Sequence, residues 1–276
     1  MKSNPVGFQG EIGSYSEEAV RKYFQGKAST ISYKTLHDLF QSLENNEIEQ
    51  ALIPIENSLE GSVTEAYDLL LKSTVKVNGE TILRIVHSLI GHPGVGKQDI
   101  RTVYSHPQAL AQCRRYLRVL GVETIAAYDT AGSVKMVKER NARDSAAIAS
   151  RAAAETYDMD VIEEGIADEE SNYTRFFLLS MREVEPTGED KTSIIFSASH
   201  VPGSLYRTLE DFANRGINLT KIESRPTRQK PWEYFFFLDF EGHKDDKNCR
   251  EVLETISKRT DFLKIIGSYP RVKEKV

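Results

Sequence analysis

The sequence predicts an α/β protein, in which a two-lobed domain is followed by a smaller ferredoxin-like domain with the element order βαββαβ. Three observations lead to this prediction. Short β-branched runs alternate with amphipathic helical runs over most of the chain. The run Thr81 to Gly91 has no turn signal and predicts a strand that crosses into a second lobe. The segment Glu183 to Lys191 mixes Pro and Gly with charged residues, which is typical of a linker between domains.

The first lobe is predicted from two strand-and-helix pairs. These pairs are Val6 to Gln9 with Glu17 to Phe24, and Gln50 to Ile55 with Val63 to Leu71. In the first helix the apolar side chains fall on one face, and Ser14 or Ser16 is placed to cap the free amides. The loop before this helix therefore presents backbone N–H groups.

Three more strand-and-helix pairs predict the second lobe. They are Thr102 to Tyr104 with Ala109 to Leu120, Thr124 to Ala127 with Gly132 to Glu139, and Ala146 to Ile148 with Ser150 to Tyr157. The later run Tyr173 to Met181 indicates a strand that returns to the first lobe. Two lobes joined by crossing strands are expected to leave a cleft.

After the linker, six elements give the ferredoxin-like pattern. They are strands at Thr192 to Ala198, Ile217 to Glu223, Glu233 to Phe240 and Phe262 to Tyr269, and helices at Leu205 to Ala213 and Arg250 to Ser257. Both helices carry an apolar stripe at helical spacing. From Asp190 onward 16 basic and 13 acidic residues give a charge of +3, whereas the preceding part carries −8. Pattern and charge therefore change at the same place.

Composition excludes several functional classes. The net charge of −5 gives no broad electrostatic footprint for nucleic acid or an anionic membrane. Cys113 and Cys249 are far apart and lack His or Cys neighbours at ligand spacing, so neither a disulfide framework nor a zinc site is expected. The first twenty residues are interrupted by glutamates and do not resemble a signal peptide, and no run is long enough to span a bilayer. A cytoplasmic protein is the expectation.

Polar clusters lie at the ends of predicted strands, where open α/β sheets bind their ligands. The loop Gly10 to Ser16 could hold a carboxylate or phosphate at a helix start, or it could be a plain turn. The segment Pro54 to Val63 places Glu56, Asn57 and Ser58 in succession, which exceeds what a helix cap needs.

Three further junctions carry similar alternatives. In Ser105-His106-Pro107-Gln108 a capped helix start explains Ser105 and Pro107 but not the other two residues, and His106 is either a proton donor or structural. Asp129 to Ser133 is most simply a helix cap. In Asn172 to Phe176 a hydroxyl and a guanidinium enter an apolar strand, where they could be structural or bind a carboxylate.

Taken in order, these clusters resemble the signature of the prephenate dehydratase family. The matching segments are Gly13-Ser14-Tyr15-Ser16, Pro54-Ile55-Glu56-Asn57-Ser58, Ser105-His106-Pro107-Gln108-Ala109-Leu110 and Asn172-Tyr173-Thr174-Arg175-Phe176. The later segments Pro202-Gly203-Ser204-Leu205-Tyr206 and Ile222-Glu223-Ser224-Arg225-Pro226 resemble the phenylalanine-sensing ACT domain of the same enzymes. Ser204 stands where this ACT motif often has Ala.

The resemblance implies a two-lobed catalytic domain of the type II periplasmic-binding-protein fold, followed by an ACT domain. The catalytic domain is expected over residues 1–186, with lobe one at about 1–78 plus 165–186 and lobe two at about 79–164. The ACT domain is expected over residues 191–276. The implied reaction converts prephenate to phenylpyruvate with loss of carbon dioxide and water, under control by L-phenylalanine. It implies no cofactor and no metal, because aromatisation drives the reaction.

The resemblance also implies residue roles. The catalytic residues would be Thr174, as donor to the leaving oxygen, with Glu56 and Arg175. The substrate-binding residues would be Ser14, Asn57, Ser58, Ser105, His106, Gln108, Thr130, Asn172 and Phe176. The effector-binding residues would be Pro202, Gly203, Ser204, Leu205, Asn218, Glu223 and Ser224. Thr174 could relay a proton from Glu56, and Arg175 could either bind a carboxylate or brace the cleft.

Several alternatives stay open at this point. Arogenate dehydratase would use nearly the same machinery, and a non-catalytic two-lobed protein could bind a small carboxylate. An amino-acid-responsive regulator lacks a basic DNA-reading helix. Similar ACT domains bind an amino acid where two of them pair, so a homodimer or homotetramer is expected. The sequence leaves open whether L-phenylalanine inhibits or activates.

Overall fold

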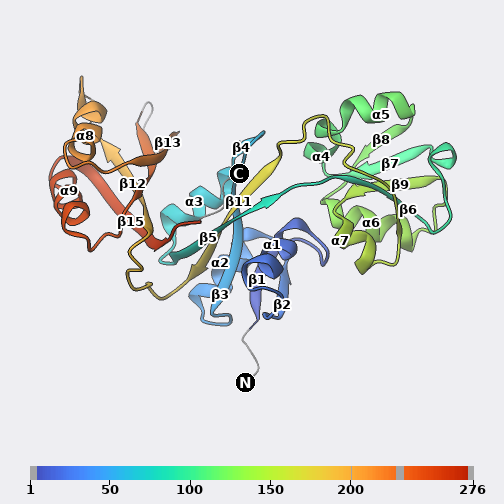
Figure 1. Ribbon diagram of the computed structural model, residues 1–276, viewed down its shortest axis with the longest axis horizontal. Coiled ribbons are helices and arrows are strands. Elements are labelled where there is room, and N and C mark those ends of the chain that lie inside the picture. The colour runs from blue at the N-terminus through green and yellow to red at the C-terminus, as the bar shows by residue number, and fades with distance from the viewer. Residues whose placement is uncertain (1–4, 200, 228–232, 273–276) are drawn as a thin grey trace. The chain divides into compact units, whose positions relative to one another are not determined.

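The computed structural model describes residues 5–199, 201–227 and 233–272 (Figure 1). The predicted domain ends at 1–4 and 273–276 lie outside the described residues. The chain divides into two compact units, residues 1–66 with 81–176 and residues 67–80 with 177–276. Each unit is described by itself.

The first sheet has the strand order β2-β1-β3-β11-β5, with the short β4 paired to β3. Its strands are β1 (Val6–Gln9), β2 (Thr30–Tyr33), β3 (Gln50–Asn57), β4 (Gly61–Ser62), β5 (Lys76–Arg84) and β11 (Tyr173–Ser180). The accompanying helices are α1 (Tyr15–Tyr23), α2 (Leu36–Glu44) and α3 (Thr64–Lys72). β1 runs parallel to both neighbours, so the strand ends that precede α1 and α3 lie at the same edge of the sheet.

The second sheet has the order β10-β6-β9-β7-β8. Its strands are β6 (Ser88–Gly91), β7 (Thr102–Ser105), β8 (Glu123–Ala126), β9 (Ser145–Ala149) and β10 (Asp160–Glu164). Its helices are α4 (Pro107–Gln112), α5 (Arg114–Leu120), α6 (Thr130–Glu139) and α7 (Arg151–Thr156), with a single 3-10 turn, η1 (Lys97–Asp99). One apolar cluster holds α4 and α5 against the sheet, and a separate one holds α6 and α7, so helices cover both faces.

The third sheet is antiparallel, with the order β13-β14-β12-β15. Its elements are β12 (Asp190–Ala198), α8 (Ser204–Ala213), β13 (Leu219–Pro226), β14 (Tyr234–Glu241), α9 (Lys247–Ser257) and β15 (Thr260–Pro270). Both helices cover one face, where Phe212 of α8 and Val252 of α9 pack on Ile194 and Phe240 (Figure 1). The predicted ferredoxin-like βαββαβ order is confirmed.

Two predictions from the sequence are wrong in detail. The run Thr81 to Gly91 is not one strand, because its residues between β5 and β6 leave the strand ladder. Ile85 N–H donates to the Asn172 carbonyl, and the Val86 carbonyl accepts from the Tyr15 hydroxyl. The predicted helix Ala109 to Leu120 is also two helices, α4 and α5, that meet at the buried Cys113. Three elements of the structure, β2, α2 and β10, were not predicted from the sequence.

Candidate active site

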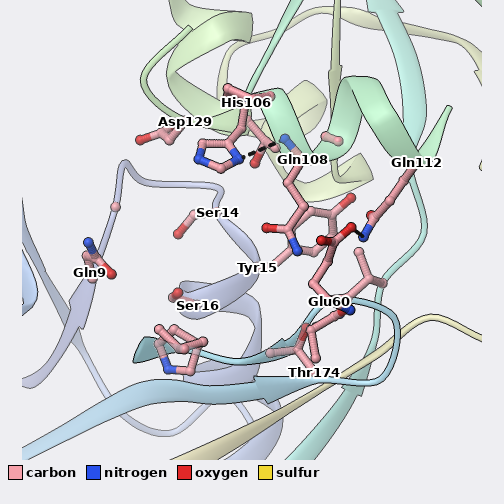
Figure 2. Close-up of a pocket in the computed structure, with 18 of the residues that line it drawn as sticks. Gln9, Ser14, Tyr15, Ser16, Glu60, His106, Gln108, Gln112, Asp129 and Thr174 are labelled. Carbon is pink, nitrogen blue, oxygen red and sulfur yellow. Dashed lines mark hydrogen bonds between the residues drawn. The ribbon is translucent and has the colours of Figure 1, made fainter. Parts of the chain in front are cut away.

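A cavity of about 720 Å³ lies within the first unit, at the sheet edges where the polar clusters meet. In Figure 2, His106 and Thr174 are at opposite ends of the view, and Tyr15, Glu60 and Gln108 are between them. Of the residues predicted as catalytic or substrate-binding, those in the lining are Ser14, Asn57, His106, Gln108, Thr130, Thr174 and Phe176. The structure therefore brings together seven of the twelve predicted residues, which are far apart in the sequence.

The loop before α1 is held in place by its glycine and its serine. Gly13 has φ = 86°, and a Cβ there would lie 2.8 Å from the Ala153 Cα, so the close approach of this loop to α7 requires glycine. Ser14 is the N-cap of α1, with its hydroxyl accepting from Glu17 N–H at 3.4 Å. The Ser14 side chain thus lies at a helix start that faces the cavity.

The two central strands, β3 and β11, divide their polar residues between opposite faces. Side chains alternate along a strand, so Asn57, Thr174 and Phe176 reach the cavity. Glu56 and Arg175, their neighbours in sequence, are not in the lining. The Arg175 guanidinium instead donates to Glu56 Oε1 at 3.0 Å, with the Arg175 side chain 10% exposed. The geometry thus favours bracing by Arg175 over the predicted carboxylate binding, and it does not place Glu56 to relay a proton to Thr174.

Asn57 is the centre of the hydrogen bonds at this end of the cavity. Its Oδ1 accepts from the N–H groups of Leu59 (3.0 Å) and Glu60 (3.1 Å). Its Nδ2 donates to Asn172 Oδ1 at 2.7 Å and to Thr174 Oγ1 at 3.0 Å. Because Thr174 Oγ1 accepts from Asn57, the Thr174 proton is available to a ligand in the cavity.

The second lobe contributes the starts of two helices. His106 is the N-cap of α4, and its Nδ1 accepts from Gln108 N–H at 3.3 Å (Figure 2). This contact gives His106 a structural role as a cap, while its other ring nitrogen is left as a donor at the cavity it lines. Thr130 begins α6 beside the cap Asp129, whose carboxyl pKa is raised by burial. The prediction that Asp129 caps this helix is confirmed.

Three residues predicted to bind substrate are placed elsewhere. The Ser105 hydroxyl is fully buried and donates to the Ile148 carbonyl at 2.6 Å. Ser58 joins the end of β3 to β11, since its hydroxyl donates to the Ser171 carbonyl at 3.1 Å. Asn172 is also fully buried and bonds to Asn57. These side chains do not line the cavity, and their hydrogen bonds hold the surrounding chain in place.

The lining residues that the sequence analysis did not predict include Tyr15, Glu60, His87 and Gln112. Two of them had a signal. Gln112 follows Gln108 by one helical turn and shares its face of α4, and His87 is a polar residue inside the apolar run that crosses between the lobes. Tyr15 and Glu60 lie within clusters that were identified, but nothing in the sequence singled them out.

Burial sets the protonation of three groups near the cavity. It lowers the pKa of His87, although its hydrogen bond with Gln112 acts in the opposite direction. It raises the pKa of Tyr15 well above the ordinary value. It also raises the pKa of the Cys113 thiol to about 12. His87 is therefore neutral at physiological pH, and Cys113 is an unreactive thiol.

The remaining lining residues set the polarity of the cavity. One part is apolar and consists of Leu36, Pro54, Val63, Ile85 and Phe176. Among the described lining residues there is no lysine or arginine. The donors that the lining offers to an anion are hydroxyl, amide, imidazole and backbone N–H groups.

A second cavity of about 370 Å³ lies in the second unit, beside the connection between β12 and α8. Of the predicted effector residues, Pro202 and Ser204 line it, and Gly203 between them has φ = 79° at the start of α8. The other predicted residues lie at Leu205 on α8, at Asn218 before β13, and at Glu223 and Ser224 on β13.

Within the described ranges 5–199, 201–227 and 233–272, no group of three or more His, Cys, Asp or Glu side chains is arranged to hold a metal ion. No helix in this part of the chain is long and apolar enough to cross a membrane.

Comparisons with protein families give two matches. A family model described as prephenate dehydratase matches residues 6–184. A model described as ACT domain matches residues 192–257. Both matches agree with the resemblance found in the motifs.

Among curated relatives, a bifunctional chorismate mutase/prephenate dehydratase from Aquifex aeolicus is 37% identical over 98% of this chain and 74% of its own length. An arogenate dehydratase/prephenate dehydratase from Arabidopsis thaliana is 39% identical over 96% of this chain and 71% of its own.

Among solved structures, a prephenate dehydratase from Arthrobacter aurescens in complex with L-Phe has a TM-score of 0.89 and 30% identity, covering 98% of this chain and 91% of its own. A protein described as a novel type of quorum quenching acylase has a TM-score of 0.89 and 31% identity, covering 97% of this chain and 98% of its own.

Proposed function

Because the chain belongs to the prephenate dehydratase family, we propose that the cavity of its first unit converts prephenate to phenylpyruvate. The ring carboxylate leaves as carbon dioxide and the 4-hydroxyl leaves as water, so the ring becomes aromatic. The enzyme is a lyase. The observation that supports this most is the Thr174 hydroxyl, which faces the cavity while its oxygen accepts from Asn57.

Thr174 acts as a hydrogen-bond donor to the departing hydroxyl. The bond from Asn57 Nδ2 occupies an acceptor position of Oγ1 and directs the threonine proton away from Asn57. A donor placed where negative charge develops lowers the barrier, and general acid assistance of this kind is typically worth about 10²–10⁴ in rate. Thr174 itself keeps its proton, because a hydroxyl is too weak an acid to lose it, and the departing hydroxide takes the proton that makes it water from solvent.

The two carboxylates of prephenate need donors, which helix starts supply. Ser14 at α1 and Thr130 at α6 lie in the lining at the N-termini of helices of nine and ten residues. Gln108 and His106 add side-chain donors on the second lobe. The carboxylate that leaves would face the apolar side of the cavity near Phe176, because strong binding of that group would oppose its loss.

Glu56 and Arg175 take a supporting role in this proposal. Their ion pair joins β3 to β11, the two strands that carry Asn57 and Thr174. Holding the strands in register keeps the Asn57 amide within 3.0 Å of the Thr174 hydroxyl. The pair therefore acts on catalysis through position.

We assign the catalytic domain to residues 1–186, with lobe one at about 1–78 plus 165–186 and lobe two at about 79–164, and the ACT domain to residues 191–276. L-Phenylalanine is the feedback effector. Gly203 has no Cβ, so a ligand can approach the backbone amides at the start of α8. Pairing of two ACT domains would complete this site, so a homodimer or homotetramer follows. A cytoplasmic location stays a prediction.

The proposal is tested by measuring phenylpyruvate from prephenate and, in parallel, phenylalanine from arogenate, each with and without L-phenylalanine. Prephenate turnover that responds to L-phenylalanine is expected. A strong preference for arogenate would identify an arogenate dehydratase instead. Turnover of neither substrate would contradict the proposal and favour a non-catalytic carboxylate-binding protein, with acylase activity as the next assay.

A further inference from the structure

We propose that His87 is a positioning residue for the dehydration, because its Nε2–H helps to hold the Gln112 oxygen toward Asn172, which in turn supports the Asn57 amide that orients the Thr174 hydroxyl. The inference rests on the proposed role of Thr174. It follows from the direction of five consecutive hydrogen bonds, which can be worked out from the backbone outward.

The donor-to-acceptor direction of the hydrogen bonds is set first by the orientation of the Asn57 amide. Its Oδ1 accepts from two backbone N–H groups, those of Leu59 and Glu60. A backbone N–H can only donate, so the Asn57 amide cannot flip without losing both bonds. Its Nδ2 must then face Asn172 and Thr174.

The direction passes from Asn57 to Asn172 and on to Gln112. Asn172 presents Oδ1 to Asn57 at 2.7 Å, so its Nδ2 must point the other way. That Nδ2 donates to Gln112 Oε1 at 3.0 Å. Gln112 therefore presents its oxygen to Asn172, while its Nε2 lies 3.4 Å from Glu60 Oε1, which is also an acceptor.

The chain of hydrogen-bonded amides ends at His87, and its direction fixes the tautomer of the histidine ring. His87 Nε2 lies 2.8 Å from the same Gln112 Oε1, which can only accept, so Nε2 must carry the proton. In the neutral ring Nδ1 is then an acceptor, and it lies 2.9 Å from the Tyr15 hydroxyl, whose single proton is shared between Nδ1 and the Val86 carbonyl at 2.8 Å. Burial, with 3% of His87 exposed, favours this neutral form.

His87 acts through Gln112 and not on substrate. Both ring nitrogens are occupied, one by Tyr15 and one by Gln112. Without the donor at Nε2, the Gln112 amide loses the shortest of its three hydrogen bonds and can more easily turn its Nε2 toward Asn172. Asn172 would then face a donor on each side, since Asn57 cannot flip, and the hydrogen bonds that orient Thr174 would weaken.

The test uses a matched pair of variants. His87→Gln keeps an N–H donor near the position of Nε2, whereas His87→Asn keeps a polar group only near the position of Nδ1. We expect His87→Asn to lower kcat about tenfold or more with little change in KM, because the lost interaction acts in the transition state. We expect His87→Gln to retain most of kcat. His92 is also a buried histidine, with its Nε2 3.1 Å from the Val137 carbonyl, but it takes no part in the hydrogen-bond chain from His87 to Thr174. The variant His92→Asn therefore serves as the folding control.

Long-range ¹H–¹⁵N spectra of the wild-type enzyme give an independent readout. They should show His87 protonated at Nε2 and unprotonated at Nδ1. Equal kcat in folded His87→Asn and His87→Gln, or a proton on Nδ1, would overturn the inference. If the wild-type enzyme does not turn over prephenate but the Nε2–H tautomer is found, the proposed function fails and the hydrogen-bond chain stands.

Discussion

Two buried polar networks in this protein are built in the same way but end differently. In the first unit the chain from His87 through Gln112, Asn172 and Asn57 ends on Thr174, whose proton faces a cavity. In the third sheet, Ser193 bonds to Asp239 at 2.5 Å and to Tyr269 at 2.6 Å, all within the protein interior.

The difference is the reason for proposing a catalytic role for the Thr174 network. Buried polar groups must be hydrogen-bonded in any stable fold, so a satisfied network alone indicates only structure. The Thr174 network differs because its last hydroxyl accepts from the protein and keeps a proton that, among the described residues, no other side chain accepts. A reaction in which hydroxide departs requires a hydrogen-bond donor at the wall of the cavity that is not already used by the protein.

The largest effect is expected from removing that donor. Thr174→Val keeps the shape of the side chain and should lower kcat by about 10²–10⁴. Thr174→Ser keeps the hydroxyl and should retain most of the activity. Steady-state kinetics on both variants tests this, and equal activity of Thr174→Val and wild type would show that the network is structural only.

The ion pair behind the site should affect stability before it affects binding. Arg175→Met leaves the Glu56 carboxylate without its guanidinium partner, and we expect the free energy of unfolding to fall by about 1–3 kcal/mol. Denaturant titration measures this change. A large rise in KM with unchanged stability would instead mean that Arg175 binds a substrate carboxylate.

The closed network in the third sheet should behave in the opposite way to Thr174. Ser193→Ala removes one donor to the Asp239 carboxylate and should cost about 1 kcal/mol of stability. In the absence of L-phenylalanine, kcat should be unchanged. Loss of kcat without loss of stability would mean that the two networks are not distinct in function.

The smallest effect is expected in how the free energy of unfolding changes as the pH is lowered below neutrality. The pKa of His87 lies below the ordinary value of 6.5 in the folded protein. Below about pH 6.5 the unfolded chain therefore binds one more proton than the folded chain at this site, and stability falls as the pH is lowered toward the folded pKa. His87→Gln should flatten this part of the stability curve, whereas an unchanged slope would show that His87 is not the group responsible.

The sequence predicted the elements more completely than the directions of their side chains. The motifs located Asn57 at the end of one strand and Thr174 at the start of another, and these two positions meet at one edge of the sheet. The motifs also contained Glu56 and Arg175, which β-strand alternation turns away from the cavity. Neighbours in a motif therefore do not share a role when they lie on opposite faces of a strand.

The residues that were missed depend on contacts between distant segments. His87, Gln112 and Asn172 meet only because the crossing segment, α4 and β11 converge, with Ile85 N–H bonded to the Asn172 carbonyl. No local pattern encodes that meeting. The break in the predicted strand Thr81 to Gly91 has the same origin, since its backbone groups bond outside the strand ladder.

The most direct test of the account is a double-mutant cycle between Asn57 and Thr174. Asn57→Asp keeps the acceptor for the two backbone N–H groups but replaces the Nδ2 donor by an acceptor, which would capture the Thr174 proton. We predict a large loss of kcat from Asn57→Asp alone and little further loss when it is added to Thr174→Val. Losses that multiply, as for independent sites, would contradict the claim that Asn57 acts through the Thr174 hydroxyl.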